Sequence, residues 1–164
     1  MKKLGIVLLV CATGSLYALD GFFTGLGVEG NGNTREGAAL GGVMTIGLDI
    51  NDIFAAGIKP TFSSNIDTVS TLEIAGFFRY YFSRILPLPL GVLFAQAEMG
   101  TSLFFEEGET FPAFYSGLTA GWRLHVWEGL YLEPAARFGY PCGWGVGLSV
   151  VYKFDMNAPL SEGQ

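Results

Sequence analysis

Long hydrophobic runs, cysteine and histidine are all scarce in this sequence. Beyond residue 18 it contains no run of eighteen apolar residues, about the length that a membrane-spanning helix needs, so a helical membrane protein is excluded. Of its two cysteines only Cys142 lies beyond the first 18 residues, so no internal disulfide is expected. The single histidine, His125, excludes a metal site built from several histidines.

Charged residues are sparse as well. They make up 15% of the 164 residues, whereas a soluble domain has about 25%. Apolar residues make up 50%, and the 24 glycines are about twice the average share. The net charge is −6, and the basic residues of the connecting segments are Arg35 and Arg84 alone, so no nucleic-acid partner is indicated.

The first residues have the pattern of a secretory signal. Two lysines are followed by a short apolar segment, residues 4–10, and then by small residues. This arrangement predicts a signal peptide over residues 1–18, cleaved after Ala18 and too short to span a bilayer as a helix. Cleavage after Gly14 and a lipoprotein signal that ends at Cys11 are the alternatives. One domain is expected to follow, over residues 19–154.

Alternating hydrophobicity is the main signal in the rest of the chain. In residues 143–154 every second position is apolar, and most positions between them are small, polar or charged. Because a β-strand directs alternate side chains to opposite faces, this pattern predicts a strand with one apolar face. The apolar positions are Trp144, Val146, Leu148, Val150, Tyr152 and Phe154.

The same pattern recurs in segments of about ten residues separated by turn-forming sequences. Eight such segments are present, and an even number is what an antiparallel barrel needs in order to close. In the fifth segment the alternation is inverted: odd-numbered positions such as Met99 are apolar, and even-numbered positions such as Glu98 belong to the polar face. The predicted strands span residues 21–30, 38–50, 53–62, 71–82, 91–103, 113–126, 129–140 and 143–154.

Ten charged residues share the face that holds the small residues, and none lies on the apolar face. Five are acidic and five are basic, so they can neutralise one another inside a barrel. Removing one partner of a buried ion pair costs about 3–5 kcal/mol, which makes a self-paired structural network the first interpretation. A polar conduit gated by these pairs is the alternative. The ten are Glu29, Asp49, Lys59, Glu73, Arg79, Glu98, Arg123, Glu133, Arg137 and Lys153.

A soluble barrel with its apolar residues inside would show the same alternation. The interior of an eight-stranded barrel is just wide enough for side chains, and the long stripes of Phe, Trp, Leu and Ile would overfill it. Its exterior would hold only about one charge per strand, too few for solubility. Aromatic residues gather toward both ends of the strands, as two membrane–water interfaces require. The sequence therefore predicts an all-β, eight-stranded antiparallel up-and-down transmembrane β-barrel.

Two prolines fall within the predicted strands, and proline cannot donate a ladder hydrogen bond. Pro60 is interpreted as the point where the third strand leaves the membrane. Pro134 lies in the middle of the seventh strand and is interpreted as the site of a β-bulge. Pro60 is thus expected at a membrane boundary, and Pro134 is expected to interrupt the regular wall.

The pattern resembles the small eight-stranded outer-membrane barrels of diderm bacteria, the OmpA, OmpX and OmpW group. Its most specific part is the last strand, from Trp144 to Phe154, which is similar to the closing-strand signal that these proteins present to the barrel-assembly machinery. In that group the terminal Phe usually ends the chain, whereas here residues 155–164 follow and are expected to form a short periplasmic tail.

The resemblance implies a place in the cell outer membrane, with membrane lipid and the assembly machinery as partners. OmpW-like members have an apolar lumen that passes hydrophobic solutes, so the ten predicted lumen charges look more like the OmpA type. With the N-terminus in the periplasm, four connections face outward. They span residues 31–36, 63–70, 104–112 and 141–143.

Two of these outward connections have candidate roles. Glu106, Glu107 and Glu109 form an acidic tip that is interpreted either as a solvated loop or as a contact for a cation or a host protein. Cys142 is interpreted as a half-buried, unreactive thiol, with a disulfide-linked dimer as the alternative. The sequence indicates no particular oligomeric state.

These observations favour a structural or surface protein of the outer membrane with a charge-paired, largely plugged lumen, and with no catalysis, cofactor or metal. A narrow porin-like conduit for small polar solutes or ions is the alternative. A lipid-modifying barrel enzyme is the second alternative, because some such enzymes share this fold and use a histidine with a serine and a carboxylate. His125 would lie near the periplasmic end, which argues against chemistry on the outer leaflet.

Overall fold

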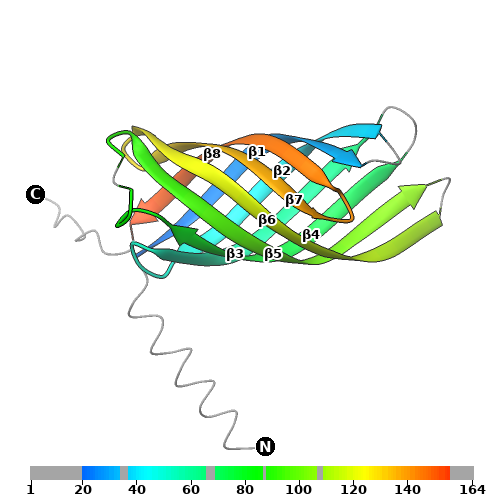
Figure 1. Cartoon of the computed structure of the whole chain (residues 1–164), viewed down its shortest axis with the longest axis horizontal. Coiled ribbons are helices and arrows are strands. Elements are labelled where there is room, and N and C mark those ends of the chain that lie inside the picture. The colour runs from blue at the N-terminus through cyan, green and yellow to red at the C-terminus, as the bar shows by residue number, and fades with distance from the viewer. Residues whose placement is uncertain (1–19, 34–36, 66–68, 87, 107–108, 156–164) are drawn as a thin grey trace, which may run out of the picture.

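The computed structural model of the chain is a closed barrel in which eight antiparallel strands follow one another in sequence order (Figure 1). It describes residues 20–33, 37–65, 69–86, 88–106 and 109–155. The predicted all-β, eight-stranded barrel is confirmed. No helix within these described ranges is long and apolar enough to span a membrane. The strands are β1 (Gly21–Asn33), β2 (Gly37–Asp49), β3 (Phe54–Ser64), β4 (Ser70–Tyr81), β5 (Gly91–Glu106), β6 (Glu109–Trp127), β7 (Leu130–Tyr140) and β8 (Trp144–Asp155).

The first and last strands close the barrel by pairing with each other. The β1–β8 register runs from Gly21 opposite Asp155 to Gly32 opposite Trp144, and the other side of β1 pairs with β2. A sheet closed in this way offers no free strand edge around the body of the described barrel. Asp155, where the predicted tail begins, belongs to β8; the rest of that tail and the predicted signal peptide lie outside the described residues.

The two ends of the barrel differ in their connections. At the end where β1 begins, which we call the turn end, Asn51 holds the β2–β3 turn: its side-chain oxygen accepts hydrogen bonds from the backbone N–H groups of Ile53 and Phe54 at 2.9 and 2.8 Å. Gly129 in the β6–β7 turn has a φ of 71°, a left-handed conformation that glycine adopts without strain. The opposite end, which joins β1 to β2, β3 to β4, β5 to β6 and β7 to β8, is called the loop end.

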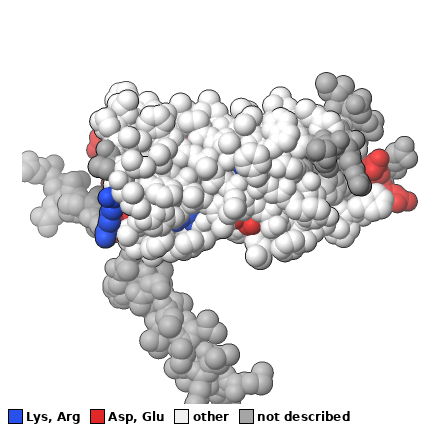
Figure 2. Space-filling model, in the orientation of Figure 1, with Lys and Arg blue, Asp and Glu red and all other residues white. Residues whose placement is uncertain are grey.

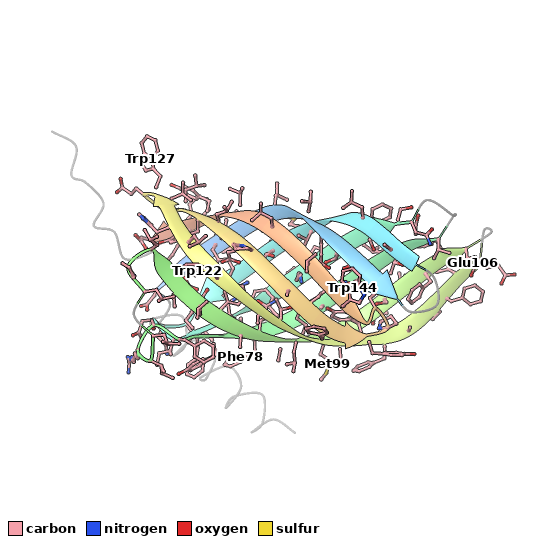
Figure 3. All side chains as sticks on the ribbon, turned by 45° about the horizontal axis from the view of Figure 1, so that its top comes forward. Phe78, Met99, Glu106, Trp122, Trp127 and Trp144 are labelled. Carbon is pink, nitrogen blue, oxygen red and sulfur yellow. The ribbon has the colours of Figure 1, made fainter. Side chains whose placement is uncertain are left out.

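Side chains alternate between the interior and the outer wall along the strands. Phe78 and Leu148 are 49% and 44% exposed, whereas Glu73 and Arg137 are 1% and 4% exposed. Figure 3 shows Phe78 of β4 and Met99 of β5 pointing away from the barrel. On the face seen in Figure 2 the wall is almost entirely uncharged, and charged atoms gather mainly at the two ends. The apolar stripes therefore form the outside of the molecule.

The inverted phase of the fifth strand is present in the structure. Phe94 and Glu98 are buried in the interior, while Met99 is exposed. Tyr81 of β4 pairs with Phe94 of β5, so an odd-numbered inward position meets an even-numbered one across the long connection 82–90. Paired residues of neighbouring strands lie on the same face of the sheet. The length of this connection and the strand register therefore decide that even-numbered residues of β5 face inward.

Aromatic side chains occupy part of the barrel interior near the turn end. The ring centroids of Phe23 and Phe77 lie 6.4 Å apart, and those of Tyr81 and Phe94 lie 6.5 Å apart. The sequence analysis assigned small and charged residues to this face and missed these rings, although they share the parity of the charged residues. The buried apolar core consists of Phe23, Ala55, Phe77, Tyr81, Phe94 and Val151.

The prediction of a loop over residues 104–112 is wrong. β5 continues to Glu106 and β6 begins at Glu109, so the two strands form a hairpin that prolongs the wall at the loop end (Figure 1). Aromatic residues are frequent in this stretch, and their strand preference, with the pairing of Phe104 and Phe111, outweighs its glycine and proline.

At the loop end, β1 and β3 also run beyond their predicted ends. β1 continues to Asn33 and β3 to Ser64, because their backbone groups still find partners on the neighbouring strands. The outward connections predicted there are therefore shorter, whereas the β7–β8 connection agrees with the prediction. The shortened connections are those at 31–36 and 63–70, of which residues 34–36 and 66–68 lie outside the described residues.

Both prolines lie in strands of regular register, so the predicted bulge at Pro134 is wrong. β3 continues past Pro60, and the point where it leaves the membrane stays a prediction. Pro60 pairs with Ile74 in the middle of β3, and Pro134 pairs in register with β8. On the other side of each proline, the ladder to β2 or β6 has a short gap and then resumes in the same register. The missing N–H thus costs local pairing only. The register shift of the wall lies instead between His125 and Trp127 of β6.

We expect alanine at Gly57 to destabilise the barrel and alanine at Gly76 to leave it unchanged. A Cβ at Gly57 would collide with the backbone carbonyl of Ile46 and the ring of Phe77, whereas the space at Gly76 is open. Overpacking of this kind costs about 1–3 kcal/mol, to be measured as the free energy of unfolding by urea in lipid vesicles. Equal stabilities of Gly57→Ala and Gly76→Ala would contradict this close strand contact.

Candidate functional site

Ten ionisable side chains project into the barrel, and every strand contributes at least one. Each occupies an inward position of its strand, which is the physical reason why they meet. Nine are at most 7% exposed, and the Lys153 side chain, near the turn end, is 23% exposed. They are Glu29 of β1, Asp49 of β2, Lys59 of β3, Glu73 and Arg79 of β4, Glu98 of β5, Arg123 of β6, Glu133 and Arg137 of β7, and Lys153 of β8.

Arg137 organises the cluster nearest the loop end. Its Nε lies 2.6 Å from Glu29 Oε1, and its Nη1 donates to Glu73 Oε2 at 2.7 Å. Nη1 also donates to the Tyr115 hydroxyl at 2.6 Å, and Nη2 donates to Asn31 Oδ1 at 2.9 Å. The sequence prediction placed Asn31 in a loop and so missed it, although its odd number gives it the inward parity of β1.

Glu98 is the second centre of this loop-end cluster. Lys59 Nζ lies 3.2 Å from Glu98 Oε1 and 3.4 Å from Glu29 Oε2, so the lysine bridges two carboxylates. The hydroxyls of Tyr115 and Thr119 both donate to Glu98, which surrounds the buried carboxylate with donors.

A second cluster lies toward the turn end and is centred on Glu133. Arg79 Nη1 donates to both carboxylate oxygens of Glu133, at 2.9 and 3.0 Å, and Arg123 Nε donates to Glu133 Oε1. Arg123 Nη1 also lies 3.6 Å from Asp49 Oδ2. Lys153 Nζ lies 3.0 Å from the same Asp49 oxygen, so two basic groups share each carboxylate.

The two arginines of this turn-end cluster also lie against aromatic rings. The guanidinium carbon of Arg79 is 3.9 Å from the ring centroid of Phe94. That of Arg123 is 4.5 Å from the centroid of Phe23 and 5.0 Å from that of Tyr81. A ring face attracts a cation, most strongly where water is absent, so the aromatic core contributes to the solvation of both charges.

Gln96 connects the two clusters. It accepts a hydrogen bond from Arg79 Nε at 2.7 Å and donates one to Glu98 Oε1 at 2.7 Å. The loop-end cluster has three carboxylates and two bases, and the turn-end cluster has two carboxylates and three bases. The loop-end cluster thus has a net charge of −1 and the turn-end cluster a net charge of +1. The two charges cancel, and the neutral Gln96 amide lies between the clusters.

The cavities within the barrel are small. A central cavity beside Lys59 and Glu133 has a volume of about 30 Å³, as does a loop-end cavity beside Cys142. A cavity at the turn end, beside Asp49 and Lys153, has a volume of about 150 Å³. Pockets for small molecules usually measure roughly 300–1,000 Å³, so the charged side chains leave room for little more than water.

The remaining candidate residues lie apart from the interior network. His125 is exposed at the turn end, where its ring centroid is 5.4 Å from that of Tyr131. Glu106 pairs with Glu109 at the tip of the β5–β6 hairpin, as Figure 3 shows for Glu106, while Glu107 lies outside the described residues. In the described ranges no group of three His, Cys, Asp or Glu side chains could hold a metal ion.

The residues of the proposed closing-strand signal share one face of β8. All of them are exposed on the outer wall, and β8 is the strand that seals the barrel against β1. Their role in assembly stays a prediction. They are Trp144, Val146, Leu148, Val150, Tyr152 and Phe154.

Cys142 lies half-buried in the β7–β8 turn, outside the strands. Burial and then the nearby carboxylate of Glu73 raise the pKa of its thiol to about 12. Both causes favour the protonated form, and the thiolate is the reactive form of cysteine.

We expect Glu133→Gln to lower the free energy of unfolding by about 3–5 kcal/mol, because Arg79 and Arg123 would lose the carboxylate they share. Asp52→Asn is the matched control, since it removes an exposed ion pair with Arg84 and should cost about 1 kcal/mol or less. Urea unfolding in vesicles, followed by tryptophan fluorescence, measures both. A Glu133→Gln barrel as stable as Asp52→Asn would show that the network contributes nothing to stability.

We expect N-ethylmaleimide at pH 8 to alkylate Cys142 roughly a thousandfold more slowly in the folded protein than in urea, because a raised pKa keeps the thiol protonated. The rate in the folded state should rise about tenfold per pH unit between pH 8 and 10. Mass spectrometry follows the reaction, with Cys142→Ser as the blank. Rapid alkylation of the folded protein at pH 8 would refute the assignment of a protonated thiol.

Comparisons with known proteins bear on the fold. No protein-family model and no curated protein matches the chain. Among solved structures it is similar to Neisserial surface protein A (NspA), with 16% identity over 82% of this chain and 97% of that chain and a TM-score of 0.62.

Two further solved structures have the same architecture. The N-terminal β-barrel domain of Pseudomonas aeruginosa OprF shares 12% identity over 80% of this chain and 97% of that chain, with a TM-score of 0.55. A de novo designed transmembrane β-barrel shares 16% identity over 82% and 96%, with a TM-score of 0.50. The chain therefore has the fold of the small eight-stranded outer-membrane β-barrels.

Proposed function

We propose that the chain is an integral outer-membrane β-barrel of a diderm bacterium that serves as a structural or surface protein, with a charge-paired and largely plugged lumen. The single observation that supports this best is the division of its side chains. Large apolar residues cover the outside of the wall, and ten ionisable groups are turned inward and paired. In water this arrangement would expose an apolar band far larger than the few hundred Å² that soluble proteins tolerate.

The closed wall supports the same proposal. Hydrocarbon offers no partner for backbone N–H and C=O groups, so a membrane-spanning sheet must pair them all by closing. β1 and β8 complete this pairing, and the exposed residues Leu26, Leu118 and Phe138 are of the kind that hydrocarbon solvates. The proposed signal peptide would direct secretion of the chain, and the assembly machinery would read the exposed face of β8.

The filled interior favours a plugged lumen over a conduit. The two clusters and Gln96 form one connected network of hydrogen bonds and ion pairs, and the central and turn-end cavities beside it measure about 30 and 150 Å³. Opening a path would separate paired charges in a medium of low dielectric constant, which is costly. The outward hairpin that ends at Glu106 and Glu109 is the surface proposed for contact with an extracellular ligand.

Catalysis is not part of the proposal. His125 lies at the turn end, which the proposed orientation places in the periplasm, and its ring packs edge-on against Tyr131. The neighbours of known structure do not point to an enzyme either.

We expect the detergent-extracted protein to shift its electrophoretic mobility on heating and to give no steady conductance in planar bilayers. The mobility shift is the sign of a folded barrel, and the absence of conductance is the sign of a lumen closed by paired charges. Arg79→Ala removes a base from the turn-end cluster, and Glu98→Ala removes a carboxylate from the loop-end cluster. Each variant should still give no steady conductance, or only brief channel openings.

Each outcome of this experiment bears on one part of the proposal. A steady wild-type conductance that changes in Arg79→Ala or Glu98→Ala would replace the plugged lumen by a polar conduit. A protein that shows no heat-dependent mobility and does not float with lipid vesicles would overturn the membrane assignment itself.

A further inference from the structure

The turn-end cavity lies inside the mouth of the barrel. Its volume is about 150 Å³, compared with about 30 Å³ for the central cavity. Its lining residues come from six strands and from the β2–β3 turn. A water molecule takes up about 30 Å³ in the liquid, so the cavity is too small for a typical organic ligand and has room for a small ion with a few waters.

The charges beside this cavity do not balance. The turn-end cluster has three basic groups and two carboxylates, which gives it a net charge of +1. The compensating charge lies in the loop-end cluster, on the other side of Gln96. Figure 2 shows basic atoms at the turn end, on the left, and acidic atoms at the loop end. A positive excess in a medium of low dielectric constant attracts an anion into the free space next to it.

Two carboxylates line the cavity, and both already have donors. Asp49 Oδ1 accepts a hydrogen bond from the Tyr81 hydroxyl at 3.1 Å, and its Oδ2 lies 3.0 Å from Lys153 Nζ. Asp52 accepts two hydrogen bonds from the exposed side chain of Arg84, each at 3.1 Å. Both negative charges are therefore compensated, and the charge that is left beside the cavity is positive.

The cavity lining also holds donors that are not fully used. Lys153 Nζ has three N–H groups, Asp49 is its one ionic partner in the described part of the chain, and its side chain is 23% exposed. The Asn51 oxygen accepts two backbone hydrogen bonds, so its amide NH₂ is left as a donor without an acceptor among the described residues. Arg123 Nη1 is 3.6 Å from Asp49 Oδ2, beyond hydrogen-bond distance.

We infer that the turn-end cavity binds one small oxyanion of the phosphate class, which accepts hydrogen bonds from Lys153 Nζ and the Asn51 amide, with Arg123 as a further positive charge beside it. Lysine is a common phosphate ligand, and hydrogen bonds between charged groups are about twice as strong as neutral ones. A tetrahedral oxyanion accepts hydrogen bonds on several sides, whereas a chloride ion fills less of the cavity.

The expected occupant is a free ion and not a lipid headgroup. Asp49, Arg123 and Lys153 occupy inward positions of their strands, so the cavity faces the lumen and its mouth and not the outer wall. The inference therefore goes beyond the proposed function and does not depend on the orientation of the barrel in a membrane.

Titration of the folded barrel with inorganic phosphate tests the inference. The full chain is held at pH 7 in a maltoside detergent, which has neither charge nor phosphate, and binding is measured by calorimetry and phosphorus NMR. We expect one phosphate per chain, with chloride competing on the order of tenfold less strongly. Lys153→Gln should weaken binding on the order of tenfold, since it removes one charged hydrogen bond, and Lys153→Arg should retain it.

Two pairs of variants supply matched controls. Val92→Phe fills the cavity without changing any charge and should abolish binding, whereas Val126→Phe adds the same ring at an exposed position and should not. Asp52→Asn removes a carboxylate from the lining and should tighten binding roughly threefold. Glu106→Gln makes the same change of charge at the tip of the β5–β6 hairpin and should leave the affinity unchanged.

Every variant is first checked for the heat-dependent mobility shift, so a failure to fold is recorded against the barrel and not against the anion site. A folded wild type without saturable phosphate binding would overturn the inference, as would equal binding by Val92→Phe and Val126→Phe. If Val92→Phe does not fold, equal affinities of Asp52→Asn and Glu106→Gln would overturn it. Chloride that competes as strongly as phosphate itself would refute the assignment to an oxyanion.

Discussion

A charge that is removed from water must be paired, and the interior of this barrel is arranged around that requirement. Nine of its ten charged groups are at most 7% exposed, so each carboxylate has at least one basic partner and several basic groups touch two carboxylates. Arg137 and Glu133 are the clearest cases, because each joins side chains from several strands. The ion pairs therefore tie together strands that are far apart around the wall, beyond the backbone ladder.

The network is neutral as a whole and uneven along the barrel axis. The loop-end cluster has an excess carboxylate, the turn-end cluster has an excess base, and Gln96 joins them through an amide that can both donate and accept. Aromatic rings assist the turn-end cluster, where three basic groups share two carboxylates and the rings lie against Arg79 and Arg123. The Gln96 amide and the aromatic rings beside Arg79 and Arg123 thus stabilise the excess charge that ion pairing within each cluster leaves unbalanced.

In the proposed membrane location the outer wall obeys a different constraint, because hydrocarbon solvates side chains without demanding partners. The size of its side chains is consequently free to vary. Ala95, Ala120, Ala136 and Val146, for example, form a row of short side chains across β5 to β8. Pro60 and Pro134 illustrate the same freedom in the backbone: each leaves a gap in the ladder toward one neighbour, yet the register resumes beyond it. A closed sheet with many continuous pairs holds its register through such local losses.

Side-chain alternation by itself determined the number of strands, their order, the inverted phase of β5 and the face on which Glu29, Glu98 or Arg137 lies, because these follow from a period of two. The sequence did not determine where strands stop. Near Phe104 and Phe111, strand propensity and pairing decided the outcome over turn-forming residues. Only the tertiary structure decided which charges pair, since Lys59 and Glu98 are 39 positions apart and Asn31 and Arg137 are 106 apart. Such partners depend on register and barrel closure, which no local pattern encodes.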